Sequence, residues 1–257
     1  YHCTFCSCRS VTGHKIRAHS VAYMIKEIKF LQSNFGIREF CFIDDNFLAL
    51  KNAAVDLCEQ IIKQKINIKW SCFGIRLDLV DETVLKLMEK AGCYLLTVGI
   101  ESGSQRILDH MKKNLTLNLI EEKIKLINTK TRIKVIGNFI LGYPAEKEDD
   151  IRKTIKLARK LPLYGANFFP FHPTPGTEIF DELSANNALK VFKWETMGQD
   201  RKPYIPQGIS SKKFTWLFFL AFVNFYLRPK VIFRVLLATR SPERLKYIFY
   251  RIFRIVK

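Results

Sequence analysis

Short apolar runs alternate with amphipathic stretches along the first two thirds of this 257-residue chain. Short continuous apolar runs are typical of buried strands, and apolar residues spaced three and four apart are typical of helices. The expected strands cover residues 39–43, 68–73, 94–100, 133–141 and 166–171. The expected helices cover residues 20–33, 52–65, 81–91, 104–111, 117–130 and 148–161. Strands that alternate with helices in this way indicate βαβ units and a parallel sheet.

Polar and glycine-containing motifs stand where the expected strands end. They are Asp44-Asp45-Asn46, Arg76, Gly99-Ile100-Glu101-Ser102 and Gly142-Tyr143-Pro144. In a parallel barrel the working residues gather at the carboxyl ends of the strands. An open Rossmann-like sheet is the alternative, but no G-x-G-x-x-G motif follows any expected strand. We therefore expect an α/β fold, a partial parallel (β/α)6 TIM-type barrel that lacks its first strand, because the chain opens inside a loop.

The pattern changes after Pro173-Thr174-Pro175-Gly176. Residues 1–185 are expected to form the core domain, and residues 186–257 a basic C-terminal extension with amphipathic helices. Residues 210–257 carry eleven Lys and Arg against one acid, and so contribute +10 of the net charge of +18.

The extension combines this positive charge with apolar segments. Residues 214–227 are uncharged but too short to span a bilayer of roughly 30 Å. A helical stripe follows at Leu245, Ile248, Phe249, Ile252, Phe253 and Val256. These features favour peripheral contact with an anionic membrane through residues 210–257. Packing against the domain or against a missing partner explains them equally well, and nucleic acid is the less favoured partner.

The seven cysteines suggest no disulfide framework. Cys41, Cys58, Cys72 and Cys93 stand alone in apolar runs, where a free thiol usually acts as a small buried apolar group. No signal peptide is recognised, so the cytoplasm is the expected compartment, with a peripheral position at the inner face of the membrane as an option.

Cys3-x-x-Cys6 is the most reactive feature of the sequence. A structural zinc site needs more ligands, which only His2, His14 and His19 offer nearby. A redox dithiol of the thioredoxin type would begin a helix after a strand, and this loop does not clearly do so. Ligation of an iron–sulfur cluster suits closely spaced thiolates on one loop.

The segment Tyr1-His2-Cys3-Thr4-Phe5-Cys6-Ser7 resembles the radical S-adenosylmethionine (radical SAM) signature C-x-x-x-C-x-aromatic-C. Cys3 and Cys6 match its second and third cysteines, and the first would lie two positions before Tyr1. The resemblance covers about residues 1–185. It is most similar to the cobalamin-dependent branch, through residues 42–47, 99–104 and 173–177.

The resemblance implies a 4Fe–4S cluster and S-adenosylmethionine (SAM). Cys3 and Cys6 would be metal ligands, Cys8 would be one only as a substitute for the missing cysteine, and Phe5 would lie near the adenine. Asp44 or Asp45 could bind the ammonium group of SAM, and Arg76 could pair with its carboxylate, unless Arg76 forms a local ion pair with Asp78.

Two later strand ends complete the expected SAM site. Glu101, with Ser102 in the same motif, would meet the ribose, or else Glu101 forms a structural salt bridge. Gly142 would allow close backbone approach to the adenine, or simply form a turn. His172 and Tyr143 could face substrate.

These expectations together describe a radical SAM enzyme. It would abstract hydrogen from, or transfer a methyl group to, an unactivated carbon of a small-molecule or lipid-like substrate. An electron donor such as flavodoxin or ferredoxin would serve it, and cobalamin would be bound by a domain upstream. A cobalamin-free methylthiotransferase acting on tRNA and a catalytically inactive membrane-surface binding module are the alternatives.

Overall fold

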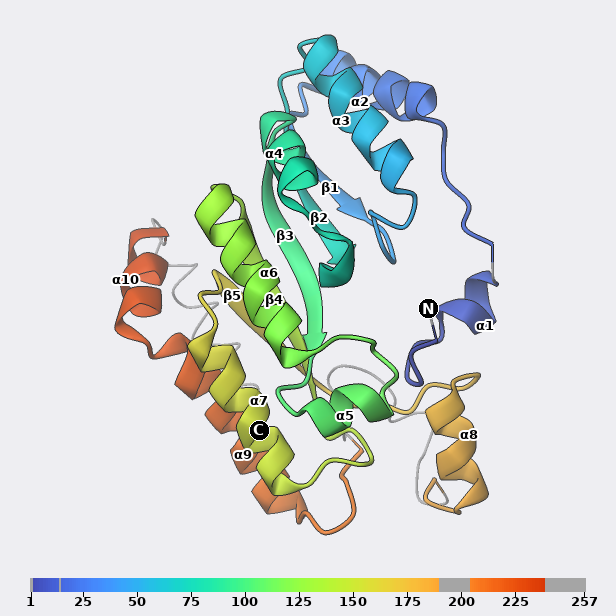
Figure 1. Cartoon of the computed structure of the whole chain (residues 1–257), viewed down its shortest axis with the longest axis vertical. Helices are drawn as coiled ribbons and strands as arrows, with labels where there is room; N and C mark the ends of the chain where they lie inside the picture. The colour runs from blue at the N-terminus through green and yellow to red at the C-terminus, as the bar shows by residue number, and fades with distance from the viewer. Residues whose placement is uncertain (1, 14, 190–203, 239–257) are drawn as a thin grey trace.

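A computed structural model describes residues 2–13, 15–189 and 204–238 of the chain (Figure 1). Its sheet has five strands: β1 (Glu39–Ile43), β2 (Lys69–Ile75), β3 (Cys93–Glu101), β4 (Lys134–Leu141) and β5 (Gly165–Pro170). All neighbouring strands are parallel, and their order in the sheet is their order in the chain. A doubly wound Rossmann sheet reverses its strand order midway, so the sequential order contradicts that alternative.

Ten α-helices are described around the sheet. They are α1 (Cys8–Thr12), α2 (Val21–Phe35), α3 (Lys51–Lys63), α4 (Glu82–Lys90), α5 (Gln105–His110), α6 (Leu117–Lys130), α7 (Glu148–Lys160), α8 (Glu178–Ala185), α9 (Ser211–Tyr226) and α10 (Pro229–Ala238). Because parallel crossovers are almost always right-handed, sequential strands put the crossover helices on one face of the sheet. Helices α4 and α6 lie along this face in Figure 1.

The predicted helix signals form as expected at α2. The Ser20 side chain accepts a hydrogen bond from the Tyr23 amide, and Gly36 ends the helix in the left-handed conformation, with φ of 67°. Asp81 caps α4 in the same way by accepting from the Val84 amide. Helix α1 and the 3₁₀ turn Leu77–Leu79 were not predicted.

The core between the sheet and its helices is dominated by aliphatic side chains. Trp70 is fully buried, and its indole N–H donates to the Ala91 carbonyl at 2.9 Å. Cys58, Cys72 and Cys93 are buried, as predicted. Cys41 is exposed, and the prediction for it was wrong: among the described strands β1 pairs only with β2, so β1 forms an edge of the sheet.

Helix α9 packs onto the same core. It buries Phe214, Leu217, Ala221 and Phe225 against β5 and α7, and the Tyr226 hydroxyl donates to the Ala166 carbonyl at 2.8 Å. The predicted stripe at residues 245–256 lies outside the described residues, and the boundary at residue 185 stays a prediction. None of the described helices combines the length and the apolarity that a membrane span needs.

Candidate active site at the cysteine loop

Cys3 and Cys6 open into one pocket. The Cys6 amide donates to the Cys3 carbonyl at 3.2 Å, which folds the loop so that both thiols line a cavity of about 320 Å³. Both thiols are free. Its other walls come from α1 and from the start of α8, and it is also lined by His2, Arg9, Ser10, Lys112, Gly176, Thr177 and Glu178.

Thr4, between the two cysteines, fixes the loop to three distant parts of the chain. Its amide donates to the Met111 carbonyl at 3.1 Å, and its carbonyl accepts from the Ile179 amide at 3.1 Å. Its buried hydroxyl lies 2.8 Å from that of Tyr143, which also lies 3.1 Å from His110 Nδ1. Tyr143 is fully buried, and this burial raises its pKa to about 12. Its hydroxyl therefore holds the cysteine loop, and a role for Tyr143 at substrate stays a prediction.

Arg76, at the end of β2, points one nitrogen at the loop. Nη1 lies 3.9 Å from Cys3 Sγ. Nε and Nη2 bind the two carboxylate oxygens of Asp78 at 3.0 and 3.2 Å, and Nη2 also donates to the Lys113 carbonyl at 2.9 Å. The local ion pair with Asp78 therefore forms, and it occupies the fork that a bidentate contact with a ligand would use.

Glu101 ends β3 in a strained conformation. Its φ is 67°, in the left-handed region that residues other than glycine rarely adopt. Its carboxylate accepts from Lys113 Nζ at 2.7 Å, and both side chains are about one-tenth exposed. A Cβ on Gly99 would stand 2.3 Å from this carboxylate, so the glycine makes room for the pair. Lys113 Nζ also lies 5.9 Å from the centre of the Phe5 ring, which links Glu101 to the cysteine loop.

The end of β1 is clamped onto β2. A Cβ on Gly74 would lie 2.0 Å from the Asp44 carbonyl, and Gly74 has a φ of 76°. Asp45 accepts a hydrogen bond of 2.8 Å from the Cys8 thiol, so α1 rests on this turn. Burial and the neighbouring Asp45 charge raise the pKa of Asp44 above its ordinary value. The structure thus brings Cys8 and Asp45 together, which the sequence did not predict.

Two predicted site residues face other parts of the protein. The Ser102 hydroxyl is fully buried 3.2 Å from that of Thr154 in α7. Gly142 has a φ of 87°, and a Cβ there would lie 2.8 Å from the Phe214 ring. The close approach at Gly142 is therefore to the chain's own α9, and a ligand-binding role for either residue stays a prediction.

Further polar groups lie at this end of the sheet, and one of them, Lys113, was not assigned a site role from the sequence. Lys113 carried no sequence signal, because the chain has many lysines and this one lies in a loop outside any motif. Within the described residues, the amide of Asn46 and both ring nitrogens of His172 are enclosed without a hydrogen-bond partner. Burial lowers the pKa of His172, so the neutral imidazole is favoured. Buried polar groups without partners are uncommon, and these two side chains follow β1 and β5, where a ligand could satisfy them.

The donor set for a metal is incomplete within the described part of the chain. No group of three or more His, Cys, Asp or Glu side chains is placed there to hold an ion. For the alternative zinc site, His2 lines the cysteine pocket, His19 stacks on Tyr23 with ring centres 4.8 Å apart, and His14 lies outside the described residues. Two free thiols on one pocket fit a cluster that takes its third thiolate from elsewhere.

Curated relatives are similar over most of the chain. An uncharacterized methyltransferase of Pyrococcus horikoshii is 33% identical over 234 residues, which are 91% of this chain and 50% of that protein. The cytidylyl-2-hydroxyethylphosphonate methyltransferase of Streptomyces wedmorensis is 32% identical over 189 residues, or 70% of this chain and 35% of that protein. The chain thus spans half or less of the length of these relatives.

The fold and a family model agree. The radical S-adenosylmethionine methyltransferase TsrM of Kitasatospora setae superposes with a TM-score of 0.67 at 20% identity, covering 73% of this chain and 37% of TsrM. This similarity confirms the predicted partial barrel. The family model described as the radical SAM superfamily matches residues 1–158. The chain, with its two loop cysteines and its sequential parallel sheet, therefore belongs to the radical SAM superfamily.

Proposed function

We propose that the chain is the catalytic portion of a cobalamin-dependent radical SAM enzyme that functionalises or methylates an unactivated carbon. The observation that carries the proposal is the shared pocket of Cys3 and Cys6, with Arg76 Nη1 3.9 Å from Cys3 Sγ. Similarity to proteins named as methyltransferases supports methyl transfer in particular.

Cys3 and Cys6 would hold the cluster as two of its three thiolate ligands, the third coming from a cysteine outside this chain. A nearby guanidinium favours the thiolate form of a cysteine, and Arg76 is placed to act in this way on Cys3. A cluster held there would supply the electron for reductive cleavage of SAM to methionine and a 5′-deoxyadenosyl radical. Through its buried contacts, Thr4 would hold the loop so that both thiols stay close to the ends of the strands.

The strand ends offer groups of the right chemistry for SAM. Within the described residues, Asp44 makes no ion pair or hydrogen bond, so its carboxylate is available for the ammonium group. Arg76 would meet the carboxylate through Nη1, the nitrogen that lies 3.9 Å from Cys3 Sγ, because Nε and Nη2 bind Asp78. Glu101 would accept from the ribose hydroxyls, and Phe5 would lie against the adenine.

The unpartnered groups define a second part of the proposal. The Asn46 amide and the His172 imidazole would hydrogen-bond SAM or the substrate at the ends of β1 and β5, because ligand binding would relieve the cost of leaving them unpaired. Ser102 and Gly142, which follow β3 and β4, would hold the ends of these strands in place beside the site through their contacts with α7 and α9.

Cobalamin and the substrate involve parts of the protein beyond these residues. A structure of TsrM contains cobalamin and a 4Fe–4S cluster, which supports a cobalamin partner here. We propose that a domain upstream of Tyr1 binds it. A flavodoxin or ferredoxin would deliver the electron, and a lipid-like substrate would suit the apolar C-terminal helices.

An anaerobic assay of the full-length protein tests this function. With dithionite and methyl-labelled SAM, the reconstituted protein should release 5′-deoxyadenosine or S-adenosylhomocysteine. The His172→Ala variant should lose most of this turnover, and the matched surface variant His19→Ala should keep it. Absence of SAM turnover in protein that holds its full iron content would contradict the proposal.

A further inference from the structure

The outer face of helix α9 carries a second apolar row, of which Leu220 is half-buried against the core. The inner row, Phe214, Leu217, Ala221 and Phe225, is buried. A second row, spaced four, three and four residues apart, consists of Trp216, Leu220, Val223 and Leu227. Trp216 is 53% exposed and Leu227 62% exposed. A helix that is apolar all round is normally covered on all sides, so the outer row is expected to meet something apolar.

Helix α7 places a basic row directly beside this apolar row. The two helices run parallel: Lys213 Nζ pairs with Glu148 at 3.1 Å near their first residues, and Arg228 donates to the Arg159 carbonyl at 2.7 Å near their last. The basic row, Arg152, Lys156 and Arg159, has the spacing of one helix face. Basic and apolar rows therefore lie side by side along the two helices.

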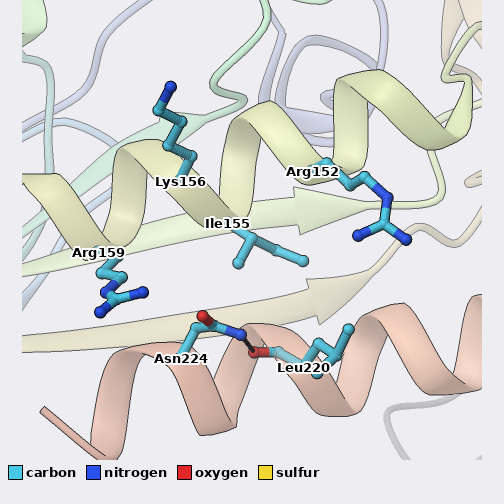
Figure 2. Close-up of a pocket in the computed structure, with 6 residues that line it drawn as sticks. All are labelled: Arg152, Ile155, Lys156, Arg159, Leu220 and Asn224. Carbon is cyan, nitrogen blue, oxygen red and sulfur yellow. Dashed lines mark hydrogen bonds between the residues drawn. The ribbon is translucent and has the colours of Figure 1, made fainter.

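A groove of about 220 Å³ lies between the two rows. Figure 2 shows Arg152, Ile155 and Arg159 extending from α7 toward α9, where Leu220 and Asn224 face them, whereas Lys156 extends away from α9. The groove has an aliphatic floor and cationic edges, and no acidic side chain lines it.

Among the described residues, three of the basic side chains on α7 form ion pairs with acidic residues, and two do not. Arg152, Lys153 and Lys160 pair with Glu148, Asp149 and Glu121 at 2.7, 2.6 and 2.6 Å. Within the part of the chain described, Lys156 and Arg159 have no acidic partner. On the other side, residues 204–238 contain five Lys and Arg and no acid. This surface therefore has unbalanced positive charge next to exposed apolar groups.

We propose that helices α7, α9 and α10 form a docking face for an anionic lipid bilayer. Lys156 and Arg159 would bind lipid phosphates. Trp216, Leu227 and Phe233, which is 65% exposed, would enter the boundary between headgroups and acyl chains. Charge complementarity favours an anionic surface, and exposed Trp216, Leu227 and Phe233 favour one that also offers an apolar layer beneath its charged groups, as a lipid bilayer does. This face lies apart from the cysteine loop, so its binding to lipid does not depend on the proposed radical SAM reaction.

Vesicle binding by the full chain tests the role of the cations. The protein should co-sediment with vesicles containing phosphatidylglycerol and not with pure phosphatidylcholine vesicles. The variant Lys156→Glu/Arg159→Glu should bind at least about tenfold more weakly, because each charge near an anionic surface contributes measurably. The control Lys29→Glu/Lys125→Glu changes the net charge equally at exposed positions on α2 and α6, and should bind like the unmodified chain.

A second pair of variants tests the apolar row. Trp216→Ser/Leu227→Ser should lose binding and the fluorescence quenching caused by brominated lipids. Tyr23→Ser/Phe35→Ser, which alters side chains 49% and 66% exposed on α2, should keep both. Thermal melting of each variant shows whether it is folded, since these side chains lie at the surface.

Three results would overturn the proposal. The first is equal binding to neutral and anionic vesicles, or equal loss in both charge-reversal variants. The second is binding of an RNA oligonucleotide that depends on Lys156 and Arg159 while vesicles do not bind. The third is a dimer in light scattering that only Trp216→Ser/Leu227→Ser dissociates, which would assign the face to a second copy of the chain.

Discussion

Lys113 Nζ lies 2.7 Å from Glu101 Oε1, and the pair is buried beside the cysteine loop. Lys113 also presents its carbonyl to Arg76 and its ammonium group to the Phe5 ring. Three of the residues predicted to serve SAM therefore meet at one lysine that the sequence did not identify.

Breaking the ion pair between Lys113 and Glu101 should lower the free energy of unfolding substantially. Removing one member of a buried ion pair typically costs about 3–5 kcal/mol, because the other charge stays buried without a partner. We expect Lys113→Met to lower the free energy of unfolding by about this amount, measured by urea denaturation. The double variant Glu101→Gln/Lys113→Met should recover much of the loss. A loss below about 1 kcal/mol for the single variant would show that the pair is hydrated or unformed.

Gly74 should tolerate no side chain. Gly74→Ala would put a Cβ 2.0 Å from the Asp44 carbonyl, in addition to the strain of its φ of 76°. Gly208, with φ of 84° and nothing within 4 Å of a Cβ, is the matched control. Gly208→Ala should cost about 1–2 kcal/mol for the left-handed conformation alone, and Gly74→Ala clearly more. Equal losses in thermal or urea unfolding would mean that the clamp between β1 and β2 is not tight.

The strand ends and the helix caps followed from local sequence. Strand Glu39–Ile43 and helix Leu117–Lys130 have the predicted bounds, because apolar runs and the periodicity of 3.6 depend on neighbouring residues. Thr4 and Tyr143 are 139 residues apart, and no local pattern indicates that their hydroxyls meet. Gly142 was recognised as a point of close approach, but only the fold shows that α9 approaches it.

Glu146 should make the free energy of unfolding decrease as the pH rises. Its carboxylate accepts from the amides of Gly142 and Tyr143 at 2.6 and 3.1 Å, but burial raises its pKa from 4.5 to about 8. Between these two values the folded state keeps a proton that the unfolded state releases. The stabilisation is thus full below pH 4.5 and is lost as pH rises through 8.

The variant Glu146→Gln isolates this effect. Relative to it, the unmodified protein should lose up to about 1.4 kcal/mol per pH unit across that window, measured by urea unfolding at several pH values. Parallel pH profiles for the two proteins would contradict the raised pKa.

Tyr143→Phe should loosen the cysteine loop. The change removes the hydroxyl that Thr4 and His110 share, and buried groups left unpaired cost about 1–3 kcal/mol. We expect faster proteolysis within residues 2–13 and a lower iron content after reconstitution. Tyr94→Phe, which removes a surface hydrogen bond to Glu39, should change neither. Unchanged proteolysis in Tyr143→Phe would show that the loop is held by other contacts.

Iron content per chain, measured for single cysteine variants of the full-length protein after anaerobic reconstitution, tests the central claim most directly. Unmodified protein should hold about four irons in one 4Fe–4S cluster. Cys3→Ala and Cys6→Ala should each lose the cluster, while Cys8→Ala and the exposed Cys41→Ser should retain it. A full iron content in both Cys3→Ala and Cys6→Ala would contradict the assignment of this loop as the cluster site.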